Sequence, residues 1–161
     1  MSIYMKADGI IGGVTSIGYA GMTEVSEVAF DGISNGANTV VGQDSDRITR
    51  RPHVGKVRLV KSADKSSHHF FQAAHKGTVI DSIELYYVTA GNPPFTYQKI
   101  KLTNPIVSHY SSEHNNESQT ATEYITLDYT AIEQTFIPRD EKNNPQSPLI
   151  SGYDLPTAKS L

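Results

Sequence analysis

Apolar and polar residues alternate with a period of two through most of this chain, and that alternation limits the fold more than any other feature. A period of two is typical of strands that bury one face, because successive side chains point to opposite sides of a sheet. In residues 2–8, for example, Ile3, Met5 and Ala7 share one side. Further strands are predicted in residues 22–30, 57–60, 78–90, 95–102, 106–110 and 122–137. About seven or eight strands of this kind indicate an all-β barrel or sandwich.

A single helix is predicted over about residues 64–76, where the apolar residues no longer alternate. Asp64 or Ser66 can cap its first turn, because a short side-chain oxygen accepts hydrogen bonds from the unpaired N–H groups there. Gly77 ends it, since glycine readily adopts the left-handed conformation that closes many helices. The prediction is therefore an all-β, mainly antiparallel fold with one helix.

The last predicted strand, residues 122–137, changes phase along its length. Leu127 and Tyr129 follow one alternation, and Ile132 and Phe136 follow another that is shifted by one residue. A shift of one residue is what a β-bulge produces, so the segment is predicted to be one long bulged strand.

A proline-rich composition sets residues 138–161 apart from the rest of the chain. These prolines argue against regular structure over most of the segment, because proline cannot donate to a strand ladder. Apolar residues remain at 149–150 and 153–155, and they are predicted to dock on the body. We therefore predict a β-domain over residues 1–137, followed by a C-terminal arm.

The predicted extended loop, about residues 33–55, is long, polar and rich in charge. Irregular segments of this length are uncommon in compact domains and are usually functional or disordered. One interpretation is a flexible surface hairpin whose charges are simply solvated. The other is an arm that binds a partner, in which Arg47, Arg50 and Arg51 hold carboxylates through bidentate hydrogen bonds.

Composition argues against several classes of function. The 161 residues carry 14 Lys and Arg against 17 Asp and Glu, and this net charge of −3 argues against binding nucleic acid or an anionic membrane through bulk charge. Cysteine is absent, so disulfides, thiolate nucleophiles and cysteine-based metal sites are excluded. No apolar run reaches the roughly 20 residues of a membrane span, and the first residues lack the apolar core of a secretion signal.

The search for catalytic and cofactor motifs finds almost nothing. The glycine-rich phosphate loops, the nucleophile elbow and the paired histidines of zinc hydrolases do not occur. His68 and His75 share a face of the predicted helix but lie about 10 Å apart along it, too far for two ligands of one metal without a third between them. His114 beside Glu113 could form only a weak cation site, and a solvated loop is the simpler interpretation. We predict that the chain is not an enzyme and uses no metal or cofactor.

Several short motifs in a fixed order carry a resemblance to a known family. They are Ile3-Tyr4-Met5-Lys6, Asp64-Lys65-Ser66-Ser67, Lys76-Gly77-Thr78, Ile106-Val107-Ser108 and Gly152-Tyr153-Asp154-Leu155. Together they resemble the haemolysin-coregulated protein (Hcp) family, the tube protein of bacterial type VI secretion. The match covers nearly the whole chain, although the tryptophans that many members carry at the end of the second strand and in the last strand are absent.

The resemblance implies a small β-barrel of two sheets with one flanking helix and a long extended loop. It also implies that six copies form a ring, and that rings stack into a tube inside a contractile sheath, capped by a spike. Some members hold small effector proteins in the ring lumen. The expected partners are therefore further copies of the chain, spike and sheath proteins and small effectors, without nucleic acid or membrane insertion. The expected location is the bacterial cytoplasm, followed by secretion without a cleaved signal peptide.

Three sets of residues are predicted to make these contacts. Tyr86 and Val88 are predicted at the protomer interface, because that stretch is apolar on both faces. Glu27 and Ala29 are predicted to face the lumen. The ring-stacking residues in the extended loop are Asn35, Asp44, Asp46, Arg47, Arg50 and Arg51.

Two other functions stay open on sequence alone. A stand-alone β-barrel that binds a carbohydrate or peptide would be monomeric and would expose an aromatic platform, for instance Tyr86, Tyr87, Phe95 and Tyr97. A small hydrolase is disfavoured because no catalytic constellation supports it. The mass of the protein in solution separates a ring from a binding module.

Overall fold

The computed structural model describes residues 1–48 and 50–161, so Thr49 of the predicted extended loop lies outside the described residues. Within these described residues, the elements are one helix, α1 (Ser67–Lys76), and thirteen strands. The strands are β1 (Ser2–Ala7), β2 (Thr23–Val25), β3 (Glu27–Phe30), β4 (Ile33–Ser34), β5 (His53–Val54), β6 (Val57–Ser62), β7 (Ser82–Thr89), β8 (Phe95–Thr103), β9 (Ile106–Glu113), β10 (Thr122–Asp128), β11 (Ala131–Phe136), β12 (Leu149–Asp154) and β13 (Lys159–Ser160). The predicted all-β class with one helix is confirmed.

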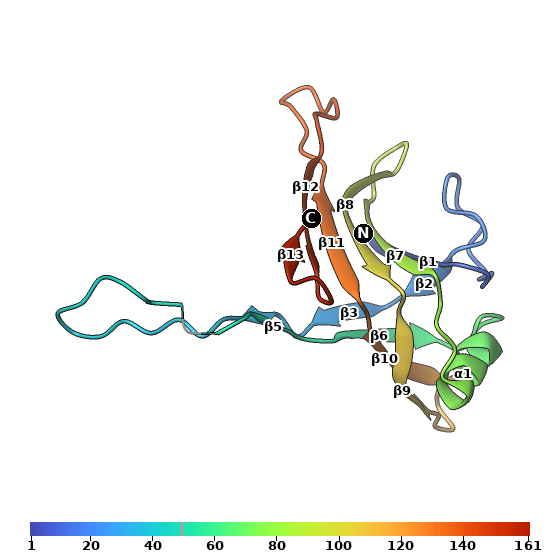
Figure 1. Ribbon diagram of the computed structural model, residues 1–161. Helices are drawn as coiled ribbons and strands as arrows, with labels where there is room; N and C mark the ends of the chain where they lie inside the picture. Colours follow the sequence, from blue (N-terminus) through green and yellow to red (C-terminus); the bar gives the residue numbers. More distant parts are fainter. Residues whose placement is uncertain (49) are drawn as a thin grey trace.

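Two antiparallel sheets share one hydrophobic core (Figure 1). The larger sheet has seven strands in the order β13-β12-β11-β8-β7-β1-β2, and the smaller has four in the order β3-β6-β10-β9. Helix α1 packs beside β9. The core takes side chains from both sheets and from the helix, among them Met5, Leu59, Phe70, Leu85, Leu102 and Leu127.

The phase change in residues 122–137 is a change of sheet, so the predicted single bulged strand is wrong. Strand β10 belongs to the smaller sheet and β11 to the larger, with Tyr129 and Thr130 at the corner between them. When a chain passes from one sheet to the facing sheet, the side of the strand that points into the core changes. A shift of the alternation by one residue brings apolar side chains to the new inward side. The predicted strand over residues 22–30 is divided in the same way, into β2 and β3 at Ser26.

Helix α1 starts three residues later than predicted because its entry is built differently. Ser66 makes no side-chain capping bond. Instead, Asp64 Oδ1 accepts hydrogen bonds from the backbone N–H and the hydroxyl of Ser66, at 2.9 and 2.5 Å. The predicted end is confirmed, since Gly77 adopts a left-handed φ of 63° and its N–H reaches the Ala73 carbonyl.

The last segment of the chain extends the larger sheet. Strand β12 pairs with β11 along its whole length, and β13 adds a further edge. The apolar residues predicted to dock are held mainly by this backbone pairing, because Leu149 and Ile150 stay 64% and 59% exposed while Leu155 packs against the core. Between β11 and β12, residues 137–148 form a loop that projects beyond the sheet (Figure 1).

Candidate functional surfaces

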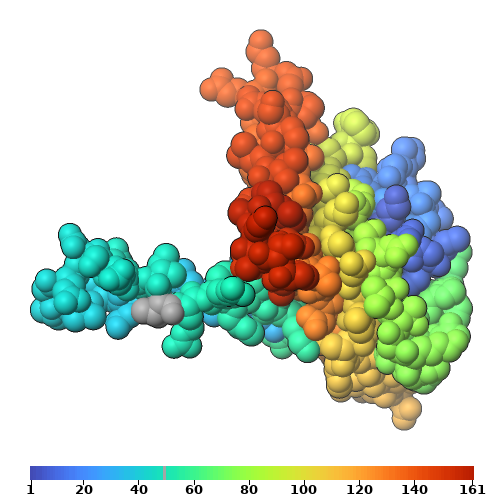
Figure 2. All heavy atoms as spheres, viewed as in Figure 1, coloured from blue at the N-terminus to red at the C-terminus, as the bar shows by residue number. Residues whose placement is uncertain are grey.

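The extended arm, residues 31–56, is a two-stranded ribbon that leaves the smaller sheet where β3 ends and β6 begins (Figure 1). Strands β4 and β5 pair near its base. Further out, Ala37 bridges to Ile48, and the N–H of Asn38 donates to the Arg47 carbonyl at 2.6 Å. The ribbon stands away from the rest of the molecule (Figure 2), so its shape is held mainly by its own backbone pairing.

In the described part of the chain, two polar contacts join the base of the extended arm to the body, in addition to the packing of Val54 against the core. The buried Tyr129 donates its hydroxyl to the Gly55 carbonyl at 2.5 Å, and Arg58 forms an ion pair with Asp31 at 2.8 Å. Burial raises the pKa of Tyr129 to about 12, with the nearby carboxylates of Asp128 and Asp31 adding to the effect. The arm therefore leaves the body from a fixed point.

The extended arm exposes apolar as well as charged side chains. Val41 is fully exposed, and Val40 and Ile48 are 52% and 73% exposed. Our sequence reasoning considered the charges and missed these apolar residues, although two adjacent valines inside a polar segment were an available signal. The predicted stacking residues are all exposed as well: Asn35, Asp44, Asp46, Arg47, Arg50 and Arg51.

The outer face of the smaller sheet carries Glu27 and Ala29, which we predicted in the lumen. Glu27 is exposed and Ala29 half-buried, whereas Val28 between them packs against the core. Strand pairing sets Glu27 beside Val60 and Ala29 beside Arg58. Across the neighbouring strand the same face continues, and a shallow depression there is lined by Glu27, Ala29, Arg58, Val60, Tyr124 and Thr126.

The two residues predicted at the protomer interface do not share a surface. Tyr86 lies half-buried on the outer face of the larger sheet, with its ring 6.2 Å from that of Tyr19. Burial and the hydrogen bond to Glu84 raise the pKa of Tyr86 above its ordinary value. Val88 is only 2% exposed, because a shift of register after Tyr87 turns it into the protein.

The aromatic platform of the alternative binding module is not assembled. Tyr86 and Tyr87 are neighbours in a strand, so they point to opposite faces of the sheet. Tyr87 and Tyr97 have ring centroids 6.3 Å apart, and the Phe95 ring is covered by the guanidinium of Arg139 at 3.2 Å. Nothing in this arrangement favours a carbohydrate-binding or peptide-binding module.

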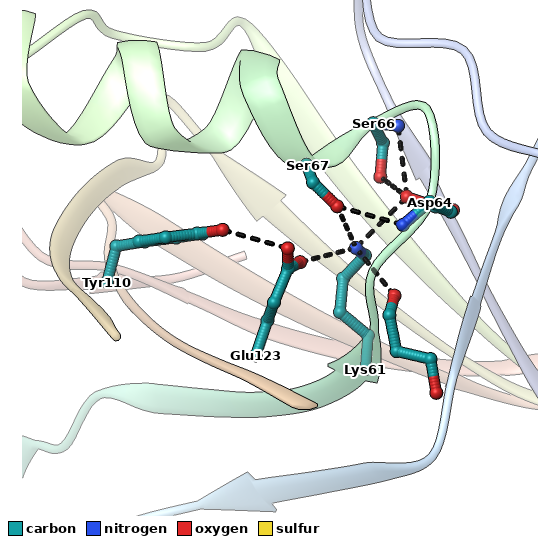
Figure 3. A network of polar contacts seen from close by, with 7 residues as sticks. Lys61, Asp64, Ser66, Ser67, Tyr110 and Glu123 are labelled. Atoms are coloured by element: carbon teal, nitrogen blue, oxygen red, sulfur yellow. Dashed lines mark hydrogen bonds and ion pairs between the residues drawn. The ribbon is translucent and has the colours of Figure 1, made fainter. Parts of the chain in front are cut away.

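A buried polar network joins the smaller sheet to helix α1 (Figure 3). Lys61 is fully buried, and its Nζ lies 2.7 Å from Glu123 Oε2 and 3.0 Å from Asp64 Oδ1. It also donates to Ser67 Oγ at 3.2 Å. Tyr110 donates to the other oxygen of Glu123 at 2.8 Å, and burial together with this bond raises the pKa of Tyr110 to about 12.

This network is structural, because its charged groups are already paired with one another. A buried lysine keeps its charge only when carboxylates and hydrogen bonds replace the lost water. Our sequence reasoning missed it, although Lys61 stands where the alternation of Val57 and Leu59 calls for an apolar residue. Within residues 1–48 and 50–161, no group of three or more His, Asp or Glu is placed to hold a metal. No helix in this part of the chain is long and apolar enough to span a bilayer.

Comparisons with known proteins identify the family. The sequence matches the family model described as "Type VI secretion system effector, Hcp" over residues 4–136. No curated protein sequence matches the chain.

Solved structures share the fold. A structure described as a type six secretion system protein superimposes with a TM-score of 0.90 at 23% identity, covering 99% of both chains. Hcp1 from Salmonella typhimurium superimposes with a TM-score of 0.78 at 20% identity, covering 99% of this chain and 98% of that one. A type VI secretion system effector from Yersinia pestis gives 0.75 at 18% identity, with coverages of 94% and 98%. The predicted family is confirmed: this chain belongs to the Hcp family, the tube proteins of type VI secretion.

Proposed function

We propose that six copies of this chain form a ring whose channel is lined by the outer faces of the smaller sheets. The observation that carries the proposal is that, within the described residues, no strand pairs with the outer edge of β3 or of β9, apart from a single bridge between Val79 and Ile106 at the start of β9. Unpaired strand edges are prone to pair with another chain. Joining β3 of one copy to β9 of the next continues the sheet, and a head-to-tail contact of this kind closes into a ring.

The channel of such a ring is wide enough to hold a small protein. Six four-stranded sheets form a wall of about 24 strands. At about 4.8 Å between strands, the circumference is about 115 Å and the backbone diameter about 37 Å. A folded domain of about 50 residues has a radius of gyration of only about 10 Å. Small effector proteins are therefore suitable cargo, and Glu27 and Ala29 are the residues we propose to meet them.

We further propose that the extended arm connects one ring to the next. Its outward strand runs about ten residues from Asp31 to Val41, or about 33 Å, whereas the seven residues of β10 span about 23 Å. The arm is thus longer than the sheet it leaves, and its exposed valines favour a contact outside its own ring. Spike and sheath proteins are the partners we propose for the assembled tube, with secretion from the bacterial cytoplasm. Tyr86 is kept as a proposed contact with a neighbouring copy, while Val88 offers no surface.

The first test is the mass of the purified protein by light scattering, with negative-stain images of the same fractions. We expect six chains and ring-shaped particles. A monomer over a wide concentration range contradicts the ring.

The second test replaces residues 36–50 with a tight turn. We expect rings that no longer stack into tubes, because the arm supplies the contact between rings. Shortening the other projecting loop, residues 140–144, is the matched control and should leave tubes intact. Unchanged stacking of the arm-shortened protein contradicts the role of the arm.

A further inference from the structure

We propose that the extended arm of one ring docks on the opposite end of the smaller sheet in the next ring, where its arginines pair with three glutamates. The occupant of this surface is thus a second copy of the chain. The inference rests on the proposed stacking and adds the residues on both sides of the contact.

The two surfaces lie at opposite ends of one sheet. At one end Phe30 pairs with Val57, and the extended arm continues from these two residues. At the other end Ser62 pairs with Thr122, which pairs in turn with Glu113. Copies that stack with their smaller sheets end to end therefore bring each arm to the far end of the neighbouring sheet.

The far end is slightly hollow and carries three exposed glutamates, with the exposed Lys65 beside Gly13 as a neighbouring cation. A depression there is lined by Gly13, Val14, Glu24, Ser62, Ala63 and Asp64. Glu24, in β2 of the larger sheet, lines this depression, whereas Glu113 is the last residue of β9 in the smaller sheet and Glu117 follows in the next loop. All three glutamates are exposed. We call Glu24, Glu113 and Glu117 the glutamate row.

The carboxylates of the glutamate row remain available, unlike their neighbour Asp64. Asp64 is already held by Lys61 at 3.0 Å. Among the described residues, the ion pairs involve Asp31, Asp64, Glu84 and Glu123, so no member of the row takes part in one. Glu113 accepts one hydrogen bond, from the Tyr124 hydroxyl at 3.3 Å. The row therefore presents negative charge that a cation from another copy can neutralise.

The extended arm carries the complementary charge at the right reach, because its three arginines outnumber the two exposed carboxylates of Asp44 and Asp46. Arg47, Arg50 and Arg51 are exposed, and the ion pairs found over residues 1–48 and 50–161 include none of them. Arg51 lies six residues before Val57, so an extended strand carries it about 20 Å beyond the sheet. The three arginines thus stand clear of their own copy, within reach of the next.

Local structure in the arm orients two of these arginines. The Nε of Arg47 donates to Thr39 Oγ1 at 3.0 Å. Arg50 crosses the ribbon over Gly36, where an added Cβ would come within 2.1 Å of its Cγ. The guanidinium groups keep further donors for carboxylates, which they bind in bidentate geometry. Each pair is weak by itself, but the contact repeats six times around a ring and therefore acts multivalently.

Charge reversal tests the proposal. The first variant carries Arg47→Glu, Arg50→Glu and Arg51→Glu, and the second carries Glu24→Lys, Glu113→Lys and Glu117→Lys. Each alone should need at least about a tenfold higher protein concentration to form tubes, because an attraction becomes a repulsion. Mixed one to one, the variants should form tubes again, since the acidic arm of one meets the basic end of the other.

The readouts are sedimentation velocity and negative-stain tube length, with light scattering to verify six chains in every variant. A matched control, Glu141→Lys with Lys142→Glu, reverses two charges on the other projecting loop and should stack like the parent protein. Single variants that stack normally, or a mixture that fails to recover, would overturn the inference while leaving the ring intact. Glu113 lies in β9, the strand proposed to join the next copy, so a glutamate variant that loses its ring is replaced by Glu24→Lys with Glu117→Lys, to which the same outcomes apply.

A cross-link provides a second measurement that does not require long tubes. Because the chain has no cysteine, Arg50→Cys with Glu24→Cys introduces the only two thiols. A bis-maleimide reagent should join them between rings and give a ladder of linked chains on a denaturing gel. Lys142→Cys with Glu24→Cys is the control and should give no ladder. No ladder from the first pair, or equal ladders from both, contradicts the proposed contact.

Discussion

The body and the extended arm differ in how far their side chains are buried, although the strands of the smaller sheet continue directly into the arm. In the body, Phe70 and Leu127 are fully buried, and even the charge of Lys61 is enclosed and paired. In the arm, Val41 is fully exposed and the described residues at the outer end are all accessible to solvent. Burial therefore stabilises the body, whereas the arm keeps its shape through backbone pairing and leaves its side chains for partners.

This contrast teaches that stability and assembly reside in separate parts of the chain. A change in the body should lower the free energy of unfolding, and assembly should fail only as a consequence. A change in the arm should leave the free energy of unfolding untouched and impair assembly directly.

The largest effect is expected from opening a cavity in the core. Leu127→Ala removes a fully buried side chain, and such changes cost about 3 to 5 kcal/mol because the cavity refills only partly. Urea unfolding followed by circular dichroism measures the loss. Ile48→Ala in the extended arm is the matched control and should change the free energy of unfolding by less than about 0.5 kcal/mol. Similar losses at both positions would break the distinction between body and arm.

A somewhat smaller effect is expected from the buried network. Lys61→Met leaves the carboxylate of Glu123, which is 3% exposed, without its cation, and such a change costs about 3 kcal/mol. Adding Glu123→Leu removes the unpaired buried carboxylate, so the double variant should be more stable than Lys61→Met alone. Urea unfolding of the parent protein, the two single variants and the double variant forms a double-mutant cycle. A double variant less stable than Lys61→Met would mean that Glu123 stabilises the fold through contacts other than its ion pair with Lys61.

Alkaline pH should weaken the body through two tyrosines, the buried Tyr129 and the partly buried Tyr110. The pKa values of Tyr110 and Tyr129 are raised from 10.0 to about 12, chiefly by burial. Between pH 10 and 12 the unfolded chain therefore loses protons that the folded chain keeps. The stability that these groups contribute is complete below pH 10 and falls as the pH rises through that window. Urea unfolding at pH 9 and pH 11 measures the decline.

Tyr129→Phe refines this prediction at the junction of body and arm. At neutral pH it should cost about 1 kcal/mol, because the Gly55 carbonyl loses its donor. It should also reduce the decline between pH 9 and pH 11. Tyr97→Phe is the control at neutral pH, since its hydroxyl is exposed beside the sulfur of Met1. An unchanged alkaline decline in Tyr129→Phe would assign the effect to other groups.

The smallest effect on stability is expected at the tip of the extended arm. Val40→Ser with Val41→Ser changes two exposed residues, so the free energy of unfolding should shift by less than about 0.5 kcal/mol. Tube length in negative stain should nevertheless fall, because apolar contact with the next ring is lost. Tubes of parental length would show that the arm acts through its charges alone.

Much of the fold was predictable because periodicity is a local property. Alternation marked most of the strands, and Gly77 marked the end of the helix. The same evidence misjudged residues 122–137, since a change of phase looks alike whether a strand bulges or crosses to the facing sheet. Only the pairing partners, far away in the sequence, separate these cases.

The candidate surfaces were predictable in part for a related reason. The alternation placed Val28 and Glu27 on opposite faces, as the structure has them, although Phe30 on the face of Val28 is exposed. The length and charge of the extended loop distinguished it from the strands. Val88 was misjudged as a surface residue because the register shift beside it arises from pairing with β8. Lys61 was overlooked because Glu123, its main partner, lies 62 residues away.

The sequence by itself therefore determined the all-β class, the single helix, the long charged excursion and the family to which the chain belongs. Tertiary structure decided which sheet each strand joins and which side chains are enclosed. It also decided that the extended arm is a ribbon at the end of the smaller sheet opposite Glu113. The division has one physical reason. Alternation, turns and helix stops depend on neighbours along the chain, whereas register, burial and charge pairing depend on residues that only the folded chain brings together.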